Sequence, residues 1–277
     1  SDIGKSLAQS VAQSFEEENG EAVATGECGD DLTWSLSSDG TLTISGTGDM
    51  YDYISDGISA NTPWAKFLID IKKVEVRGSI GHIGKLAFSN CSNLRSIGLP
   101  EAISSIGEQA FSYCSSLISI SIPSSVTSID YQTFFGCSSL TTIILPDSLE
   151  FIGNYAFDSC SSLGSIILPE SVVSIGRGAF TNCSSLTSVC LPSNISSIEY
   201  AAFSSCSSLK NVYYAGSKAR WNSISISEGN EVLLNAAIYY QSSYSDIGIS
   251  FSGVCGENLT WNLSSDGTLT ISGTGDK

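Results

Sequence analysis

Residues 110–123 read Ala-Phe-Ser-Tyr-Cys-Ser-Ser-Leu-Ile-Ser-Ile-Ser-Ile-Pro, and the same pattern returns along the chain at a fixed interval. Its Phe and Pro keep one register, and its cysteine recurs six times, as Cys91, Cys114, Cys137, Cys160, Cys183 and Cys206. The interval is about 23 residues, and a fixed period of about 20 to 50 residues is typical of a solenoid, in which each turn buries its apolar side against its neighbours. The period therefore predicts a repeat array.

Each repeat contains a Leu-x-x-Ile-x-Leu-Pro segment, a second short apolar segment and an Ala-Phe-x-x-Cys corner. In a strand, successive side chains point to opposite faces, so we expect Ile120 to point inward and Ser119 and Ser121 to point outward. Pro ends the segment because it cannot donate to a ladder. The pattern predicts one buried column made of Ile97, Ile120, Ile143, Ile166 and Val189.

This combined pattern resembles the treponemal-type, BspA-like class of leucine-rich repeats from position 71 to position 208, about half of the chain. We expect a right-handed leucine-rich-repeat solenoid with one parallel strand per turn. The resemblance implies a secreted or cell-surface protein of a host-associated bacterium, and it implies adhesion to a host matrix protein as a class of activity. The chain as given carries no signal peptide, so the extracellular or cell-surface location follows from the resemblance.

The cysteine column has two interpretations, a metal or redox site and a buried ladder of reduced thiols. No Cys-x-x-Cys pair occurs and the chain has a single His, so zinc-binding spacing is absent. Unpaired Cys is among the most buried residue types, which favours the structural ladder. Cys28, Cys190 and Cys255 lie outside the column, and we expect Cys190, at an outward strand position, to be the most exposed thiol.

The flanks contain a duplicated unit, because residues 26–50 and 253–277 match at 20 of 25 positions. Leu32, Trp34 and Leu36 alternate before Asp39-Gly40, which predicts a β-hairpin. We therefore expect an N-terminal β-hairpin cap module at 26–70, the repeat array at 71–208, a C-terminal cap at 209–252 and a truncated second hairpin module at 253–277. For residues 1–25 we expect either an amphipathic helix or a disordered leader. At the other end, we expect the natural chain to continue beyond Lys277.

The composition of the chain argues against several classes of function. The 12 basic and 28 acidic residues give a net charge of −16, which argues against nucleic-acid and anionic-membrane partners. No apolar stretch is long enough to span a bilayer, so we expect no membrane insertion. His82 is the only imidazole and no nucleophile motif accompanies it, so we expect no catalytic residues, no metal and no cofactor. The Asp-Gly pairs of the hairpin units fit turns better than calcium ligands.

The outward strand positions form two columns that are candidates for ligand binding. The first is polar and includes Ser119, Thr142, Ser165, Ser188 and Asn211. The second becomes apolar along the chain through Ile144, Ile167, Cys190 and Tyr213. An exposed apolar stripe is a candidate contact surface. Two functions fit: a non-catalytic adhesion module that presents this face to a protein or glycan, such as host extracellular matrix, or a structural spacer that displays other domains.

Overall fold

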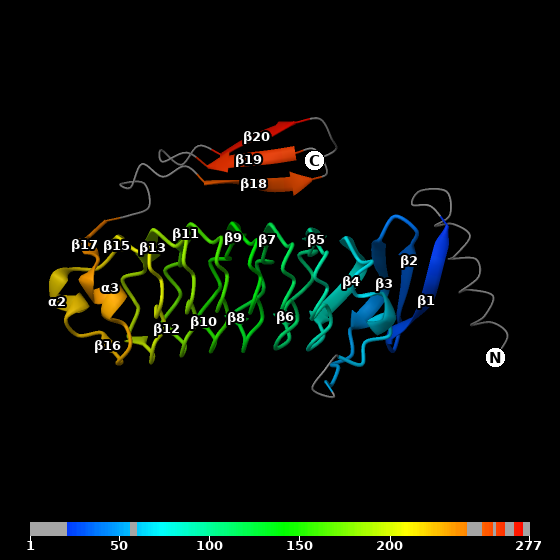
Figure 1. The fold of residues 1–277 in the computed structure, drawn as a ribbon, viewed down its shortest axis with the longest axis horizontal. Helices are drawn as coiled ribbons and strands as arrows, with labels where there is room; N and C mark the ends of the chain where they lie inside the picture. Colours follow the sequence, from blue (N-terminus) through cyan, green and yellow to red (C-terminus); the bar gives the residue numbers. More distant parts are fainter. Residues whose placement is uncertain (1–20, 56–59, 243–250, 257–258, 264–268, 274–277) are drawn as a thin grey trace.

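The computed structural model describes residues 21–55 and 60–242, together with the backbone of three strands, β18 (Phe251–Gly256), β19 (Leu259–Leu263) and β20 (Leu269–Gly273). The turns stack in one row between an N-terminal sheet and two short helices (Figure 1). The predicted solenoid with one parallel strand per turn is therefore observed.

Each turn contributes one strand to either side of the row. The Leu-x-x-Ile segments form the first side, which we call the strand face: β5 (Ser96–Gly98), β7 (Ser119–Ser121), β9 (Thr142–Ile144), β11 (Ser165–Ile167), β13 (Ser188–Leu191), β15 (Asn211–Tyr214) and β17 (Ala237–Tyr240). The Ser-Ile segments form the second side: β6 (Ser105–Ile106), β8 (Ser128–Ile129), β10 (Phe151–Ile152), β12 (Ser174–Ile175), β14 (Ser197–Ile198) and β16 (Ser225–Ile226). Paired residues on neighbouring turns are one sequence period apart through most of the array, as the repeat requires.

The N-terminal module is joined to the array through backbone hydrogen bonds. The predicted hairpin is present as β2 (Leu32–Ser37) and β3 (Thr41–Asp49), with Trp34 opposite Ile44. Strand β3 then pairs in parallel with β4 (Lys73–Ile83), which is long enough to pair with both β5 and β6. A third strand, β1 (Ala22–Gly29), pairs with β2 and begins before the expected module boundary at residue 26, so the leader prediction is wrong for residues 22–25. Residues 1–20 lie outside the described part of the chain.

The array also continues past its expected end at Ser208. Strands β15 and β17 extend the strand face in register, with Val212 opposite Val189 and Ile238 opposite Val212. The segment that was expected to be a separate cap therefore continues the strand ladder. It departs from the repeat only between the strands, where α2 (Lys218–Trp221) and α3 (Glu231–Asn235) make the interval from β15 to β17 longer than the repeat period. The boundary between array and cap was misplaced because the sequence pattern changes before the strand pairing ends.

A column of stacked aromatic rings runs through the interior. The six corner phenylalanines stack with centroids 5.2–5.5 Å apart and are fully buried. Trp64, just before the 3₁₀ helix η1 (Ala65–Phe67), takes the next place in the column, 5.8 Å from Phe88, and donates a hydrogen bond from Nε1 to the Ala87 carbonyl. Trp34 and Tyr53 pack edge-on against Trp64 and close this end of the column.

The inward isoleucine column is mostly as predicted. Ile97, Ile120, Ile166 and Val189 are buried, with exposed fractions of at most 8%. Ile143 departs from the prediction, because it is only partly buried and packs against the edge of the core. The periodic assignment of inward positions is correct for four of the five turns.

Part of the second hairpin unit is also described. Strands β18, β19 and β20 form an antiparallel sheet in which Trp261 lies opposite Ile271, the same pairing as Trp34 with Ile44 in the first unit. Strand β18 lies beside β9 of the strand face (Figure 1). The linker at 243–250, the loops at 257–258 and 264–268, and residues 274–277 lie outside the description, as do the side chains of the unit, including Cys255.

Candidate functional site

The strand face brings the two predicted outward columns into register across the turns. Ser119 pairs with Thr142, and Ser165 and Asn211 flank Ser188. In the second column Ser121 pairs with Ile144, while Ile167 and Tyr213 flank Cys190. Parallel pairing places such residues about 4.8 Å apart, so each column forms one row across β7 and β9 and another across β11, β13 and β15.

Exposure along the apolar column is uneven. Ile144 is 41% exposed and projects from the short strand β9, as predicted for an outward position. Ile167 and Tyr213 are partly buried. The column therefore offers one strongly exposed aliphatic side chain at its middle and partly covered apolar groups beyond it.

Cys190 is the most exposed of the described thiols, as expected, but at 9% exposed it is buried and not the solvent-facing thiol that its outward position suggested. Its small side chain lies between the larger Ile167 and Tyr213 on the neighbouring strands, which shield it. Burial raises the pKa of this thiol to about 12, so it stays protonated near neutral pH. Ser188, in the polar column of the same strand, is also buried and offers little surface to a ligand.

The apolar column gains a residue that the sequence analysis missed. Tyr239 of β17 lies beside Tyr213 with ring centroids 5.0 Å apart and planes 15° from parallel, and it is 47% exposed. The signal was present in the sequence, because Ile238-Tyr239-Tyr240 repeats the apolar and aromatic pattern of Val212-Tyr213-Tyr214. It was missed because the interval between these two segments is longer than the regular period.

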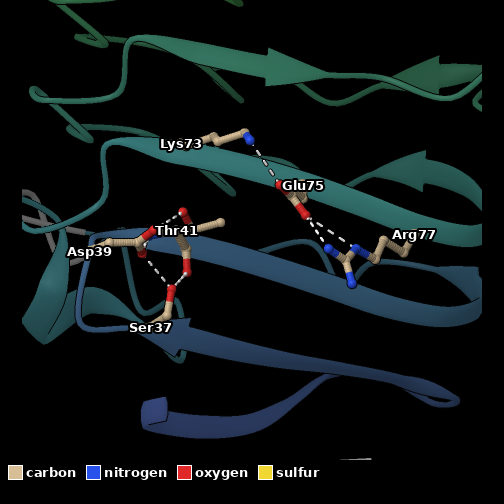
Figure 2. Close-up of polar contacts among 6 residues, drawn as sticks. All are labelled: Ser37, Asp39, Thr41, Lys73, Glu75 and Arg77. Carbon is tan, nitrogen blue, oxygen red and sulfur yellow. Dashed lines mark hydrogen bonds and ion pairs between the residues drawn. The ribbon is translucent and has the colours of Figure 1, made fainter. Parts of the chain in front are cut away.

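The strand face is preceded by β4, which pairs with β5 and adds a charged end to it. On β4, Glu75 accepts a hydrogen bond from Arg77 Nε at 3.1 Å and forms an ion pair with Lys73 at 2.9 Å (Figure 2). Partial burial alone would raise the pKa of Glu75, but the hydrogen bonds and charges of Lys73 and Arg77 outweigh it and lower the pKa. The face therefore changes from charged at β4 to apolar and aromatic at β15 and β17.

Asp39, next to this cluster, has a structural role. Its carboxylate accepts hydrogen bonds from Ser37 Oγ at 2.6 Å and from the Thr41 backbone N–H at 2.9 Å, and both close the turn between β2 and β3 (Figure 2). Burial would raise its pKa, but these hydrogen bonds lower it. Gly40, with φ of +91°, supplies the left-handed residue of the turn. Within the described residues, no three His, Cys, Asp or Glu side chains gather as metal ligands would.

His82 lies in β4 and joins the N-terminal module to the second turn of the array. Its Nδ1 is 2.7 Å from Ser105 Oγ, and its Nε2 is 3.2 Å from Asp52 Oδ1. Asp52 also accepts a hydrogen bond from the Lys85 backbone N–H at 2.6 Å, which is the main reason its pKa is lowered. In a hydrolytic triad, the Nε2 atom faces the nucleophile and Nδ1 faces the carboxylate. Here the two contacts are reversed, so the arrangement fits a structural link.

The cysteine ladder lies at the corner behind the strands and is buried throughout. From Cys114 onward each thiol donates a hydrogen bond to the carbonyl of the corner phenylalanine in the preceding turn, at 3.0–3.2 Å. Each of these carbonyls also accepts a hydrogen bond from the backbone N–H of the cysteine in its own turn, so the thiol adds a second hydrogen bond that links neighbouring turns. Burial raises the pKa of every thiol in the column, and that of Cys206 reaches about 12.

Comparison with known proteins gives one family and several structures. The family described as "BspA type Leucine rich repeat region" matches residues 66–151 and 130–247, in six copies. A leucine-rich repeat protein from Treponema pallidum is 27% identical over 68% of this chain and 81% of its own, with a TM-score of 0.40. A leucine-rich repeat protein from Eubacterium ventriosum is 21% identical over 70% and 73%, with a TM-score of 0.39.

A third solved structure, the pneumococcal vaccine antigen PcpA, is 13% identical over 79% of this chain and 99% of its own, with a TM-score of 0.38. The search of curated proteins gives no match. Among the residues that the structure describes, no helix has the length and hydrophobicity needed to cross a bilayer.

Proposed function

The chain belongs to the BspA-type leucine-rich-repeat family, and on this basis we propose that it is an extracellular binding module of a bacterial surface protein that presents its strand face to a host protein. Members of repeat families commonly bind through the extended surfaces that stacked turns create. The extracellular location is part of the proposal and rests on the family to which the repeats belong.

One observation carries this proposal: the outward apolar column contains exposed side chains, Ile144 at its middle and Tyr239 at its C-terminal end. Ile144 is 41% exposed, and the stacked pair of Tyr213 and Tyr239 follows at the C-terminal end of the face. Serine and threonine would keep such positions soluble, as they do at Ser121 in the preceding turn. Tyrosine and isoleucine together match the aromatic and aliphatic anchors that dominate protein–protein contacts.

The charge distribution favours the same class of partner. The net charge of −16 repels nucleic acid and anionic lipid, while the apolar end of the strand face contains no charged residue in the two outward columns from Ser119 to Tyr213. Partner binding there would bury apolar area without first removing the water shell of a charge.

The spacer function remains the second candidate, and the bonding between module and array favours it. Strand β3 pairs with β4 from Thr41 to Asp49, which makes the N-terminal module and the array continuous. Such a rod would hold attached domains at a fixed distance, and it needs no apolar column on its surface.

Binding to immobilised host matrix proteins, for example fibronectin and fibrinogen measured by biolayer interferometry, tests the proposal. We expect Ile144→Asp to weaken binding at least tenfold, because it places a charge in the centre of the contact. Phe151→Asp is the matched control, since Phe151 is 46% exposed but lies in β10 on the other side of the array.

Three results would contradict the proposal. Equal loss in both variants would indicate a nonspecific charge effect, and unchanged binding by Ile144→Asp would exclude the strand face. Absence of binding by the wild-type chain to the whole set of matrix proteins would favour the spacer function.

A further inference from the structure

A second surface lies at the corners of the turns, away from the strand face. It contains five aromatic residues that flank the buried phenylalanines, and we call it the aromatic strip: Tyr113, Tyr131, Phe135, Tyr155 and Tyr200. Tyr113 is 51% exposed, Tyr131 40% and Tyr200 49%. They come from four turns, so the strip follows the long axis of the array. An exposed aromatic group of this size on a single surface is a candidate binding site.

The rings of the strip are held in defined orientations by their neighbours. Tyr113 meets Phe135 edge-on at 5.1 Å, and its ring covers Gly136, where an added Cβ would stand 2.8 Å from Cδ1. Tyr155 covers Gly178 in the same way, at 2.5 Å from its Cε1. Glycine at these two positions gives each tyrosine room to lie across the next turn.

A second pair of contacts orders the other half of the strip. Tyr131 packs edge-on against Tyr155 with centroids 6.2 Å apart, and the guanidinium of Arg177 lies 4.9 Å from the centroid of the Tyr200 ring. The strip is therefore preorganised, which lowers the entropy lost when a ligand is bound.

Tyrosine is an unusual residue for the backbone conformation at two positions of the strip. Tyr113 and Tyr155 have φ of 59° and 56°, in the left-handed region that is unfavourable for a bulky residue with a Cβ. Other turns place Asn, Ser or Gly at the position of Tyr113. The same position is left-handed in every turn from Asn90 to Ser205, so the repeat itself imposes this conformation. What sets this turn apart is a half-exposed tyrosine where the other turns have a smaller residue.

Polar side chains between the rings define the chemistry of the ligand. Gln109 donates to Gln132 across one turn at 2.9 Å, and Asp158 accepts from Ser159 at 2.8 Å and from Asn182 at 3.2 Å. Asp158 is itself buried, so the partly exposed carboxamides of Gln109 and Gln132 are the groups that offer donors and acceptors to hydroxyl groups. Arg177 already contacts Tyr200, and the net charge of −16 repels polyanions.

From these observations we infer that the aromatic strip binds an uncharged polysaccharide chain. The electron-rich faces of the tyrosines accept the apolar C–H face of a sugar ring, and the carboxamides of Gln109 and Gln132 bond its hydroxyl groups. Turns repeat at about 4.8 Å, a distance comparable to the length of one pyranose unit, so a chain that runs along the array advances by about one sugar unit per turn. This site is separate from the proposed protein-binding strand face.

Affinity electrophoresis of the full chain in gels that contain amylopectin, galactomannan or arabinoxylan tests the inference, with dextran sulfate as the charged comparison. We expect retardation by at least one neutral polysaccharide and none by dextran sulfate. Tyr113→Ala and Tyr131→Ala should each raise the dissociation constant at least fivefold, while Tyr113→Phe and Tyr131→Phe, which keep the ring, should stay within twofold of wild type. Ile144→Asp should leave retardation unchanged, which separates this site from the strand face.

Three results would overturn the inference. Retardation by no neutral polysaccharide excludes this class of ligand, and wild-type affinity in both alanine variants places the binding elsewhere. Concentration-dependent self-association in light scattering that Tyr113→Ala abolishes would identify the strip as a contact between copies of this chain.

Discussion

The corner and the strand of each turn keep their register by different means. At the corner the same two residues recur in six turns, and each makes a specific contact: the phenylalanines stack at 5.2–5.5 Å, and thiols bond to carbonyls of the neighbouring turn. On the strand, only the inward position is kept apolar, and the outward one changes from Gly98 to Ser121 to Ile144. The difference indicates that the corner fixes the geometry of the array, while the outward positions are free to acquire binding functions.

The first prediction concerns the corner, where the buried thiols of the ladder should make the free energy of unfolding depend strongly on pH. An unfolded Cys has a pKa of about 8.5, whereas burial holds the ladder thiols at about 12, as for Cys206, or above. Between these values the unfolded state binds fewer protons than the folded state, so stability is complete below about pH 8.5 and falls as pH rises. Each thiol should remove about 1.4 kcal/mol from the free energy of unfolding per pH unit in this range.

Urea denaturation between pH 7 and 11 measures this slope, and one variant isolates the contribution of a single thiol. Cys137→Ala should make the slope shallower by about 1.4 kcal/mol per pH unit. Ser138→Ala, its neighbour without a thiol, should leave the slope unchanged. Identical slopes in the wild type and Cys137→Ala would mean that the ladder thiol does not titrate on unfolding, against the buried-ladder account.

A substitution with a smaller expected effect on the free energy of unfolding tests the backbone conformation of the corner. Ser205 has φ of 58°, and the residue two places after the corner phenylalanine is left-handed in every turn from Asn90 to Ser205. Ser205→Gly removes the Cβ that makes this conformation unfavourable, so we expect the free energy of unfolding to rise by up to about 1 kcal/mol.

The adjacent Ser204→Gly supplies the control, because Ser204 does not have positive φ and glycine there adds only unfolded-state entropy. It should lower the free energy of unfolding by about 0.5–1 kcal/mol. Equal destabilisation in the two variants, measured by urea denaturation, would show that the corner conformation does not limit stability.

Periodicity alone predicted the ladders, because a residue that returns at a fixed period must occupy the same place in each turn. It could not predict that Cys114 donates to the carbonyl of Phe88, since the partner of a thiol depends on how two turns are placed in space. Nor could it predict the burial of Cys190, which depends on the size of the side chains on both neighbouring strands.

The same limit explains the two misplaced boundaries. Strand β1 has the sequence Ala-Val-Ala-Thr-Gly-Glu-Cys-Gly, and its pairing with β2 depends on hydrogen bonds to a partner rather than on strong alternation of its own. At the other end, β17 continues the ladder although two helices disturb the period. In both places the backbone pairing extends beyond the sequence pattern that revealed it.

The central claim, that inward strand positions carry the fold and outward ones do not, is tested most directly by one pair of urea denaturation curves. Ile120 in β7 is 4% exposed and Ile144 in β9 is 41% exposed, so the same substitution can be made on opposite faces of neighbouring strands. We predict that Ile120→Asp lowers the free energy of unfolding by more than about 4 kcal/mol, because it buries an unpaired charge, and that Ile144→Asp changes it by less than about 0.5 kcal/mol. Comparable losses in the two variants would place Ile144 in the core and contradict the assignment of the strand faces.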